Sequence, residues 1–347
     1  MGSGDIATSV LRAMGHIQER VCGRGPMGRR WERTKRQLEG AAALMDALSV
    51  PYSGPGTGNA SCIVFSMDRA LQLHALLGSY FEMVRNPAPV TIIYKCSSAE
   101  HRAAYQEVFE EYSGHLNHIE EEDDNDGFKA ELLNVLARVD SEKVFFLVDD
   151  DLFVEPFDLA ELLALDSRYV IPSLRMGTNL AHSYTVDQAQ CLPQLFTDIE
   201  LHDGGDSTEA SHGKDSGGGI LYWQWKAGEL DWGYPLSVDG HIFDTAEILA
   251  LAETCQFSSP NTFEAALQEH TWLVSARRGA CYRKSRLVNI PCNRVQEDFS
   301  NRHGSVHQDE LLALWQAGKR MDYRALYGVV NQSAHQELPI TFVPREG

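Results

Sequence analysis

The chain has 347 residues, 43% of them hydrophobic, and can therefore bury a core large enough for one large domain or two modest ones. Its 49 aspartates and glutamates outnumber its 30 lysines and arginines, and the net charge of −19 argues against nonspecific binding to nucleic acid, which needs a basic surface. No stretch approaches the roughly 20 apolar residues that span a bilayer, and seven scattered cysteines without a CxxC pair indicate free thiols in a reducing compartment. We therefore expect a cytoplasmic protein.

Residues 1–48 are predicted to form a helical arm with an arginine-rich middle, and residues 49–61, rich in proline, glycine and serine, a linker. A basic helix can touch anionic lipid or an acidic partner, so any membrane contact is expected to be peripheral and to run through this arm. A helix that packs on the main domain accounts for the pattern more simply, and we favour it.

The main domain, residues 62–347, begins with short apolar strands that alternate with amphipathic helices. Strands are predicted at 62–65, 90–94, 116–119 and 144–148, and helices at 70–84, 99–112 and 127–139. Alternation at this spacing predicts an α/β fold, in which helices sandwich a mostly parallel central sheet.

The chain beyond the fourth strand is more mixed. Strands are predicted at 169–174 and 287–291, helices at 158–165, 245–254 and 308–317, and a helix start at 259–264 that leads to His270. The stretch 202–219, rich in glycine, serine and aspartate, predicts either a mobile lid over a ligand or a disordered insertion. Aromatic residues gather between Leu221 and Pro235, where they suit the faces of sugars and a protein core equally well.

Three consecutive carboxylates, Asp149, Asp150 and Asp151, follow the apolar strand 144–148. Ligands of open α/β folds bind at the C-terminal ends of strands, and three like charges there are costly unless a cation or a donor compensates them. A solvated turn is the plain alternative, but directly after a buried strand we favour a metal site. On an extended chain, Asp149 and Asp151 are expected to point the same way.

Five segments occur in the order seen in nucleotide-sugar glycosyltransferases of the GT-A fold, and the chain resembles uncharacterised bacterial members of that group. The segments are SMDRALQL (66–73), FLVDDDLFV (146–154), DWGYPLSVDGHIF (231–243), SSPNTFEAAL (258–267) and LVNIPCNRVQEDFSNRHG (287–304), of which FLVDDDLFV resembles the DxD motif. The resemblance runs from about Ser61 to the end. It implies a Rossmann-type αβα sandwich, with residues 62–175 binding the nucleotide sugar and residues 176–347 the acceptor.

The resemblance also implies an activity, the transfer of a sugar from a nucleotide-diphosphate sugar to a hydroxyl of a glycan or glycoconjugate. A divalent ion neutralises the charge that develops on the leaving diphosphate, and carboxylates favour Mn²⁺ or Mg²⁺. Asp151 is the first choice as a direct ligand, and Asp149 is assigned to the ribose or the water shell of the metal. Asp150 is expected to be structural or to bind sugar hydroxyls. His303 matches the C-terminal histidine that often completes the metal shell in related enzymes.

Recognition of the nucleotide is expected from polar residues that follow the first strands, namely Ser66, Asp68, Arg69, Lys95 and Lys129. Asp68 has an alternative role as the N-cap of the next helix, and Lys129 has one on a solvated helix face.

An inverting transferase needs a carboxylate that deprotonates the acceptor hydroxyl. Asp239, which precedes the turn-permitting Gly240, resembles the acid on the acceptor side of the family and is predicted to be this base. Asp231 and Glu264 are the other candidates. The ED pair common in inverting processive members is absent, and the choice between inversion and retention stays open.

Three other functions are weighed against this one. A sugar nucleotidyltransferase is expected to have a glycine-rich loop after its first strand, where this chain has SMDRA. A non-catalytic sugar- or nucleotide-binding module derived from a transferase is the main alternative, although the intact acidic triplet argues against it. A calcium-binding EF-hand would need the D-x-D-x-D-G pattern with a distal glutamate, which is absent.

Overall fold

The structure is a computed structural model that describes residues 26–49, 59–121, 127–197, 219–292 and 307–345. His303 and nearly all of the predicted loop 202–219 lie outside these ranges.

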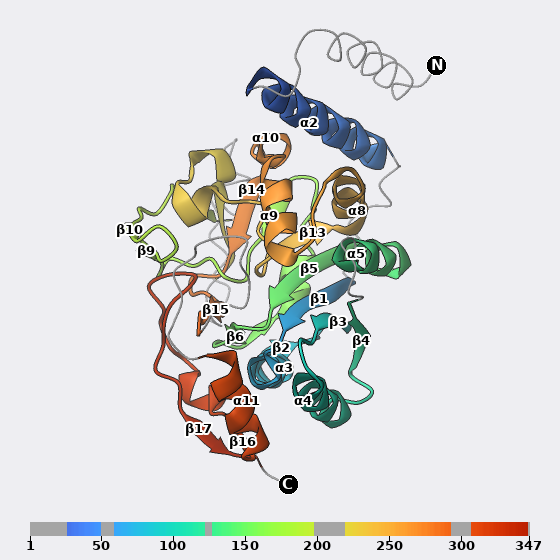
Figure 1. Cartoon of the computed structure of the whole chain (residues 1–347). Helices are drawn as coiled ribbons and strands as arrows, with labels where there is room; N and C mark the ends of the chain where they lie inside the picture. The colour runs from blue at the N-terminus through green and yellow to red at the C-terminus, as the bar shows by residue number, and fades with distance from the viewer. Residues whose placement is uncertain (1–25, 50–58, 122–126, 198–218, 293–306, 346–347) are drawn as a thin grey trace.

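A five-stranded sheet with the order β13-β5-β1-β3-β4 forms the centre of the molecule (Figure 1). Four of its strands are parallel: β1 (Ala60–Met67), β3 (Val90–Lys95), β4 (Leu116–Glu120) and β5 (Lys143–Val148). The fifth, β13 (Ile242–Asp244), comes from the second half of the chain and pairs antiparallel with β5. The predicted α/β fold with a mostly parallel sheet is therefore confirmed.

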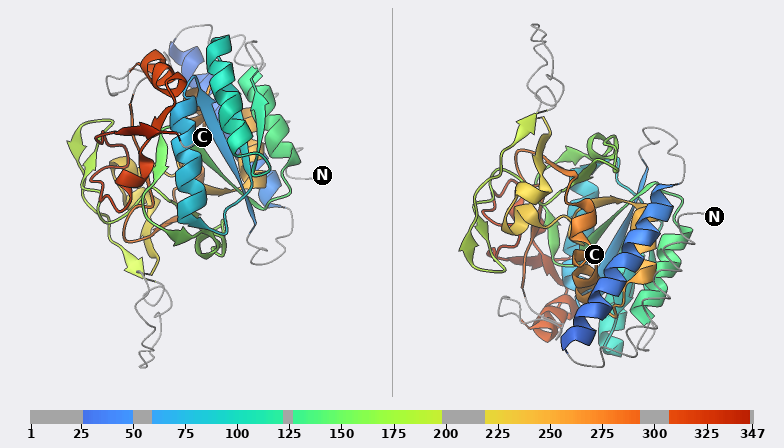
Figure 2. Two further views of the ribbon diagram at one scale, coloured as in Figure 1. Left: turned by 90° about the horizontal axis from the view of Figure 1, so that it is seen from below. Right: turned by 90° about the horizontal axis from the view of Figure 1, so that it is seen from above.

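Helices cover both faces of this sheet (Figures 1 and 2). On one face lie α3 (Ala70–Met83) and α4 (Ala99–Glu111), and on the other α5 (Gly127–Arg138) and α8 (Thr245–Thr254). Alternate residues of β1 serve the two layers: Cys62 and Val64 join the core on the α3 side, whereas Ile63 and Phe65 join the core on the α5 side. Burial on both faces is the reason why these strands are apolar throughout.

The register of the parallel strands brings their C-terminal ends to one edge. Phe65 pairs with Val148 and Met67 with Lys95, so the residues that follow β1, β3 and β5 are neighbours. After β5 the chain turns at Asp149 and Asp150 and enters β6 (Asp151–Phe153), which pairs with β15 (Leu287–Asn289).

A second, four-stranded sheet stands beside the first, in the order β11 (Phe196–Thr197), β12 (Leu221–Gln224), β14 (Arg278–Cys281) and β8 (Val170–Pro172). The other described elements are short strands and helices: β2 (Val84–Arg85), β7 (Phe157–Asp158), α6 (Leu159–Leu163), β9 (His182–Ser183), β10 (Gln188–Ala189), η1 (Trp225–Ala227), η2 (Leu230–Gly233), α9 (Pro260–Gln268), α10 (Thr271–Val274), α11 (Gln308–Gln316), β16 (Lys319–Met321), η3 (Tyr323–Leu326) and β17 (Phe342–Pro344).

The aromatic residues between Leu221 and Pro235 mainly build core. Trp223, Trp225 and Trp232 are at most 1% exposed, and the ring centroid of Trp223 lies 4.6 Å from that of Trp225 and 4.9 Å from that of Trp232. These edge-to-face pairs leave no ring face for a ligand. Of the two readings of this region, the structure therefore favours the core for the three tryptophans.

The long helix α2 (Pro26–Leu48) lies against α8 and the α9–α10 corner (Figure 1). Arg36 Nη2 is 3.4 Å from Glu269 Oε2, Gln37 Nε2 donates to the Glu269 carbonyl at 3.0 Å, and Leu44 is 3% exposed. The favoured interpretation, a helix packed on the main domain, is the arrangement observed for residues 26–48. Within the described ranges, no helix combines the length and the apolar character needed to cross a membrane.

Candidate active site

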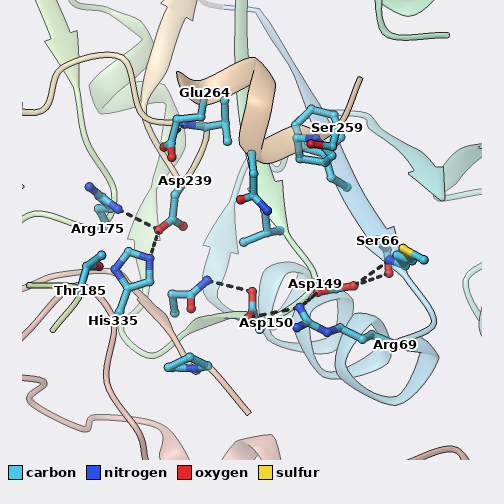
Figure 3. Close-up of a pocket in the computed structure, with 18 of the residues that line it drawn as sticks. Ser66, Arg69, Asp149, Asp150, Arg175, Thr185, Asp239, Ser259, Glu264 and His335 are labelled. Carbon is cyan, nitrogen blue, oxygen red and sulfur yellow. Dashed lines mark hydrogen bonds and ion pairs between the residues drawn. The ribbon is translucent and has the colours of Figure 1, made fainter. Parts of the chain in front are cut away.

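A cavity of about 610 Å³ opens where β1, β3 and β5 end, a volume within the range of small-molecule sites. Polar side chains from both halves of the chain line it, among them Ser66, Arg69, Lys95, Asp149, Asp150, Arg175, Asp231, Asp239, Glu264, Asn289 and His335. Figure 3 shows Asp149 and Asp150 on one side of the cavity and Asp239 with Arg175 and His335 on the other.

Asp149 is held rigidly by the protein. Ser66 Oγ donates to its Oδ2 at 2.7 Å, and Arg69 Nη1 donates to its Oδ1 at 2.9 Å. Burial raises the pKa of Asp149 to about 6, against the opposing attraction of Arg69. The compensating cation that the acidic triplet requires is therefore supplied in part by Arg69.

Asp150 is the most exposed of the three carboxylates, with 12% of its side chain accessible. Arg69 Nη1 lies 3.3 Å from its Oδ2, and Asn289 Nδ2 donates to its Oδ1 at 2.9 Å. Asp149 and Asp150 both line the cavity, and the Asp150 carboxylate is the more accessible of the two to a ligand.

Asp151 is buried and does not line the cavity. Its Oδ2 accepts from Val148 N at 2.9 Å and its Oδ1 from Asn289 Nδ2 at 3.2 Å. Burial and the neighbouring Asp239 carboxylate raise its pKa well above the usual range. The predicted common direction of Asp149 and Asp151 is wrong, because the turn at residues 149–150 interrupts the alternation of an extended chain.

Asp239 reaches the same cavity through a sharp turn. Gly240 has φ +72°, its N–H donates to Phe146 O at 2.9 Å, and Leu174 N donates to Gly240 O at 2.8 Å. The turn that Gly240 was predicted to permit is thus observed, and it places Asp239 between the end of β5 and Arg175.

The charge of Asp239 is strongly compensated. Arg175 Nη1 donates to Asp239 Oδ2 at 2.9 Å, and His335 Nε2 lies 3.3 Å from the same oxygen. Burial by itself raises the pKa of Asp239, but Arg175, a hydrogen bond from Asp151 and His335 together lower it to about 2. The other candidate bases are engaged as well: Glu264 Oε1 accepts from Ser237 Oγ at 2.7 Å, and Asp231 Oδ2 accepts from Gln190 Nε2 at 3.2 Å.

Of the other residues predicted to contact the nucleotide, one lines the cavity and two do not. Lys95 lines the cavity and pairs with Glu121 at 3.2 Å. Asp68 is buried and does not line it; its Oδ1 accepts from Ser97 N at 2.8 Å, and it provides no N-cap to α3. Lys129 also lies outside the cavity lining, and its ammonium donates to the Cys255 carbonyl just after α8. Neither Asp68 nor Lys129 is therefore placed where a ligand of this cavity would contact it.

Three residues of the site were not predicted from the sequence: Arg175, Asn289 and His335. Arg175 directly follows the predicted strand 169–174, so the strand-end rule that selected Asp149 could have found it. Asn289 is part of the predicted strand 287–291, but its pairing with Asp151 depends on the β6–β15 contact. No local sequence pattern marks His335, because a β-bridge to Asn289, far away in the sequence, brings it to the cavity.

Asp149 and Asp150 are the cavity residues that could hold a hard divalent ion, provided that a substrate shared in its coordination. Asp149 and Asp150 offer carboxylate oxygens, and Mg²⁺-type sites commonly combine one or two carboxylates with substrate phosphates and waters. Across the described ranges, no group of three or more His, Cys, Asp or Glu side chains could hold an ion. The oxygens of a diphosphate would therefore have to complete the coordination.

The known proteins found similar to this chain are glycosyltransferases. No family model matches the chain. Over 202 residues, 54% of this chain, it is 26% identical to the bifunctional glycosyltransferase pgtA of Dictyostelium discoideum, and the match covers 24% of that protein. Similar solved structures include residues 1–349 of TarS from S. aureus, with 16% identity over 74% of this chain and 70% of that one and a TM-score of 0.40. Another is the mannosyltransferase PcManGT from Pyrobaculum calidifontis in complex with GDP-Man and Mn²⁺, with 17% identity over 44% and 50% of the chains and a TM-score of 0.28.

Proposed function

We propose that this protein is a glycosyltransferase that moves a sugar from a nucleotide-diphosphate sugar to an acceptor hydroxyl, with Mn²⁺ or Mg²⁺ as cofactor. The observation that carries the proposal is that one cavity joins the Asp149–Asp150 carboxylates to the Asp239–Arg175–His335 group. The sequence similarity to the bifunctional glycosyltransferase pgtA supports the same class.

The donor would occupy the strand-end side of the cavity. Arg69 and Lys95 bring positive charge to the edge where a diphosphate would lie, and Ser66 holds Asp149 in place. Asp149 and Asp150 would hold the divalent ion together with diphosphate oxygens, and Asp151 would support them from below through Asn289. When bound, the ion supplies Lewis-acid stabilisation to the leaving diphosphate.

The acceptor would approach from the side of Asp239, which supports a direct displacement with inversion. The carboxylate predicted as the base lies in this part of the cavity wall, opposite the Asp149–Asp150 pair.

A thermal-shift screen of UDP- and GDP-sugars with and without Mn²⁺ tests the proposal. One nucleotide sugar is expected to stabilise the protein in the presence of metal, by about 2.7 kcal/mol at a ligand concentration of 100 times Kd. Asp150→Ala should remove the metal-dependent part of this shift, whereas Asp166→Asn, a change at an aspartate paired with Arg168 outside the cavity lining, should retain it.

Two results would contradict the proposal. If no nucleotide sugar stabilises the protein with or without metal, the donor site is wrong. If one binds but no nucleoside diphosphate is released with any acceptor, the protein is a binding module and not an enzyme.

A further inference from the structure

We propose that His335, oriented by Asp239, is the group that removes the proton from the attacking hydroxyl. The inference rests on the proposed function and deepens it, because it assigns the catalytic base to a different residue from the carboxylate that the sequence indicated.

His335 is fixed by its backbone and open at its side chain. Asn289 N donates to Ala334 O and Gln336 N donates to Asn289 O, both at 2.9 Å, so the residue is clamped against the strand that supports the acidic triplet. Ala334 is fully buried, yet 27% of the His335 side chain is accessible and lines the cavity. The backbone is thus held at the cavity wall, and the partly exposed His335 side chain can meet a substrate there.

Asp239 has the properties of a positioning residue more than those of a base. It is 5% exposed, its Oδ2 already accepts from Arg175, and its pKa of about 2 makes it a weak proton acceptor. The same oxygen lies 3.3 Å from His335 Nε2, and Figure 3 shows the ring turned with that edge toward Asp239.

A carboxylate beside one ring nitrogen selects the tautomer of a histidine. Because Nε2 is the ring nitrogen paired with Asp239, we assign the ring proton to Nε2 and the lone pair to Nδ1. Within the described parts of the chain, no hydrogen bond engages Nδ1 of His335. This nitrogen is therefore available to a hydroxyl group in the cavity.

The proton and electron movements balance. The acceptor oxygen attacks the anomeric carbon while its proton passes to Nδ1, and the bond from that carbon to the diphosphate oxygen breaks. The electron pair leaves with the nucleoside diphosphate. The imidazolium is stabilised by Asp239 and then releases its proton to water, which restores the starting state.

The test measures nucleoside diphosphate release as a function of pH, with the nucleotide sugar that stabilises the wild type as donor. Water and a set of simple sugars serve as acceptors in parallel, so the natural acceptor need not be known. The wild-type rate should fall toward acid pH, because a protonated imidazole cannot accept the proton of the hydroxyl. His335→Gln should lower the rate about 10² to 10⁴-fold and abolish this acid limb while donor binding measured by calorimetry is retained.

Two further variants separate a catalytic role from a structural one. Added imidazole should restore part of the activity of His335→Ala. His182→Gln is the matched control, because His182 Nε2 also lies 3.3 Å from an aspartate, Asp187, but outside the cavity lining; its rate and pH profile should equal those of the wild type.

The outcomes distinguish the inference from the function on which it rests. If His335→Gln keeps the wild-type rate and its fall toward acid pH, while Asp239→Asn or Glu264→Gln loses activity, the role of His335 is overturned. The proposed transferase function would then still stand. Absence of nucleotide-sugar binding, or binding without release, in the wild type would overturn the proposed function and the inference with it.

Discussion

At the scale of single residues, three adjacent aspartates have three different environments. Asp149 is held by Ser66 and Arg69, Asp150 faces the cavity, and Asp151 is buried against Asp239. Their spacing in the sequence could not distinguish them, because the turn between β5 and β6 sets each side-chain direction separately. The amide of Asn289 donates to both Asp150 and Asp151 and thereby ties the triplet together.

The role of Asn289 is testable by substitution. Asn289→Asp should lower the free energy of unfolding by more than Asn289→Ala, because it removes two donors and also adds a fourth carboxylate beside three others. We expect a loss of about 1 to 3 kcal/mol for the alanine variant. Urea unfolding of both variants measures the difference, and equal stability of the aspartate variant and the wild type would contradict this account.

At the scale of elements, local patterns predicted most helices and strands well. The predicted helix 245–254 has the same bounds as α8, and Asp244 caps it by accepting from Ala246 N and Glu247 N. For the helix start predicted at 259–264, the structure gives the first residue: Ser259 forms a capping box and α9 begins at Pro260, upstream of Glu264. These features depend on neighbours within one turn, which is why the sequence alone reveals them.

The docking of α2 also depends on one small residue. A Cβ at Gly40 would lie 2.2 Å from His270 Nε2, and the His270 ring is buried with its nitrogens near Ala266 O and Arg36 O. Gly40→Ala should therefore lower the melting temperature, although alanine favours helices by about 1 kcal/mol.

A double-mutant cycle provides the control for this prediction. In a His270→Ala background the steric conflict is removed, so the same Gly40→Ala change should become neutral or stabilising. A melting temperature that rises on Gly40→Ala in the wild-type background would show that α2 does not pack in this way.

At the scale of the whole molecule, folding places titratable groups in the interior of an acidic protein. His241 is fully buried beside Trp225, with Nδ1 3.0 Å from the Pro235 carbonyl. Burial, reinforced by Arg175, lowers its pKa to about 3. A histidine outside the fold has a pKa of about 6.5, so unfolding takes up a proton at mildly acidic pH.

Because the pKa of His241 is lower in the folded state than in the unfolded state, its contribution to the free energy of unfolding is complete above about pH 6.5. This contribution is lost as the pH falls toward 3, by about 1.4 kcal/mol for each pH unit. The loss of stability between pH 6.5 and 5 should be smaller for His241→Gln, whose amide can still donate to Pro235. Equal slopes of unfolding free energy against pH in the two proteins would contradict the prediction.

The sequence by itself determined the layered α/β architecture, the strand that ends in carboxylates and the turn at Gly240. Hydrophobic periodicity, helix caps and residue types with few conformational options indicate these features, and all three act over short distances along the chain. Only the tertiary structure decided that Asp150 faces the cavity in place of Asp151, that Lys129 lies elsewhere, and that Arg175 and His335 meet at Asp239. Those contacts depend on the pairings β5–β13 and β6–β15 and on the bridge to Asn289, which join segments far apart in sequence and leave no local pattern.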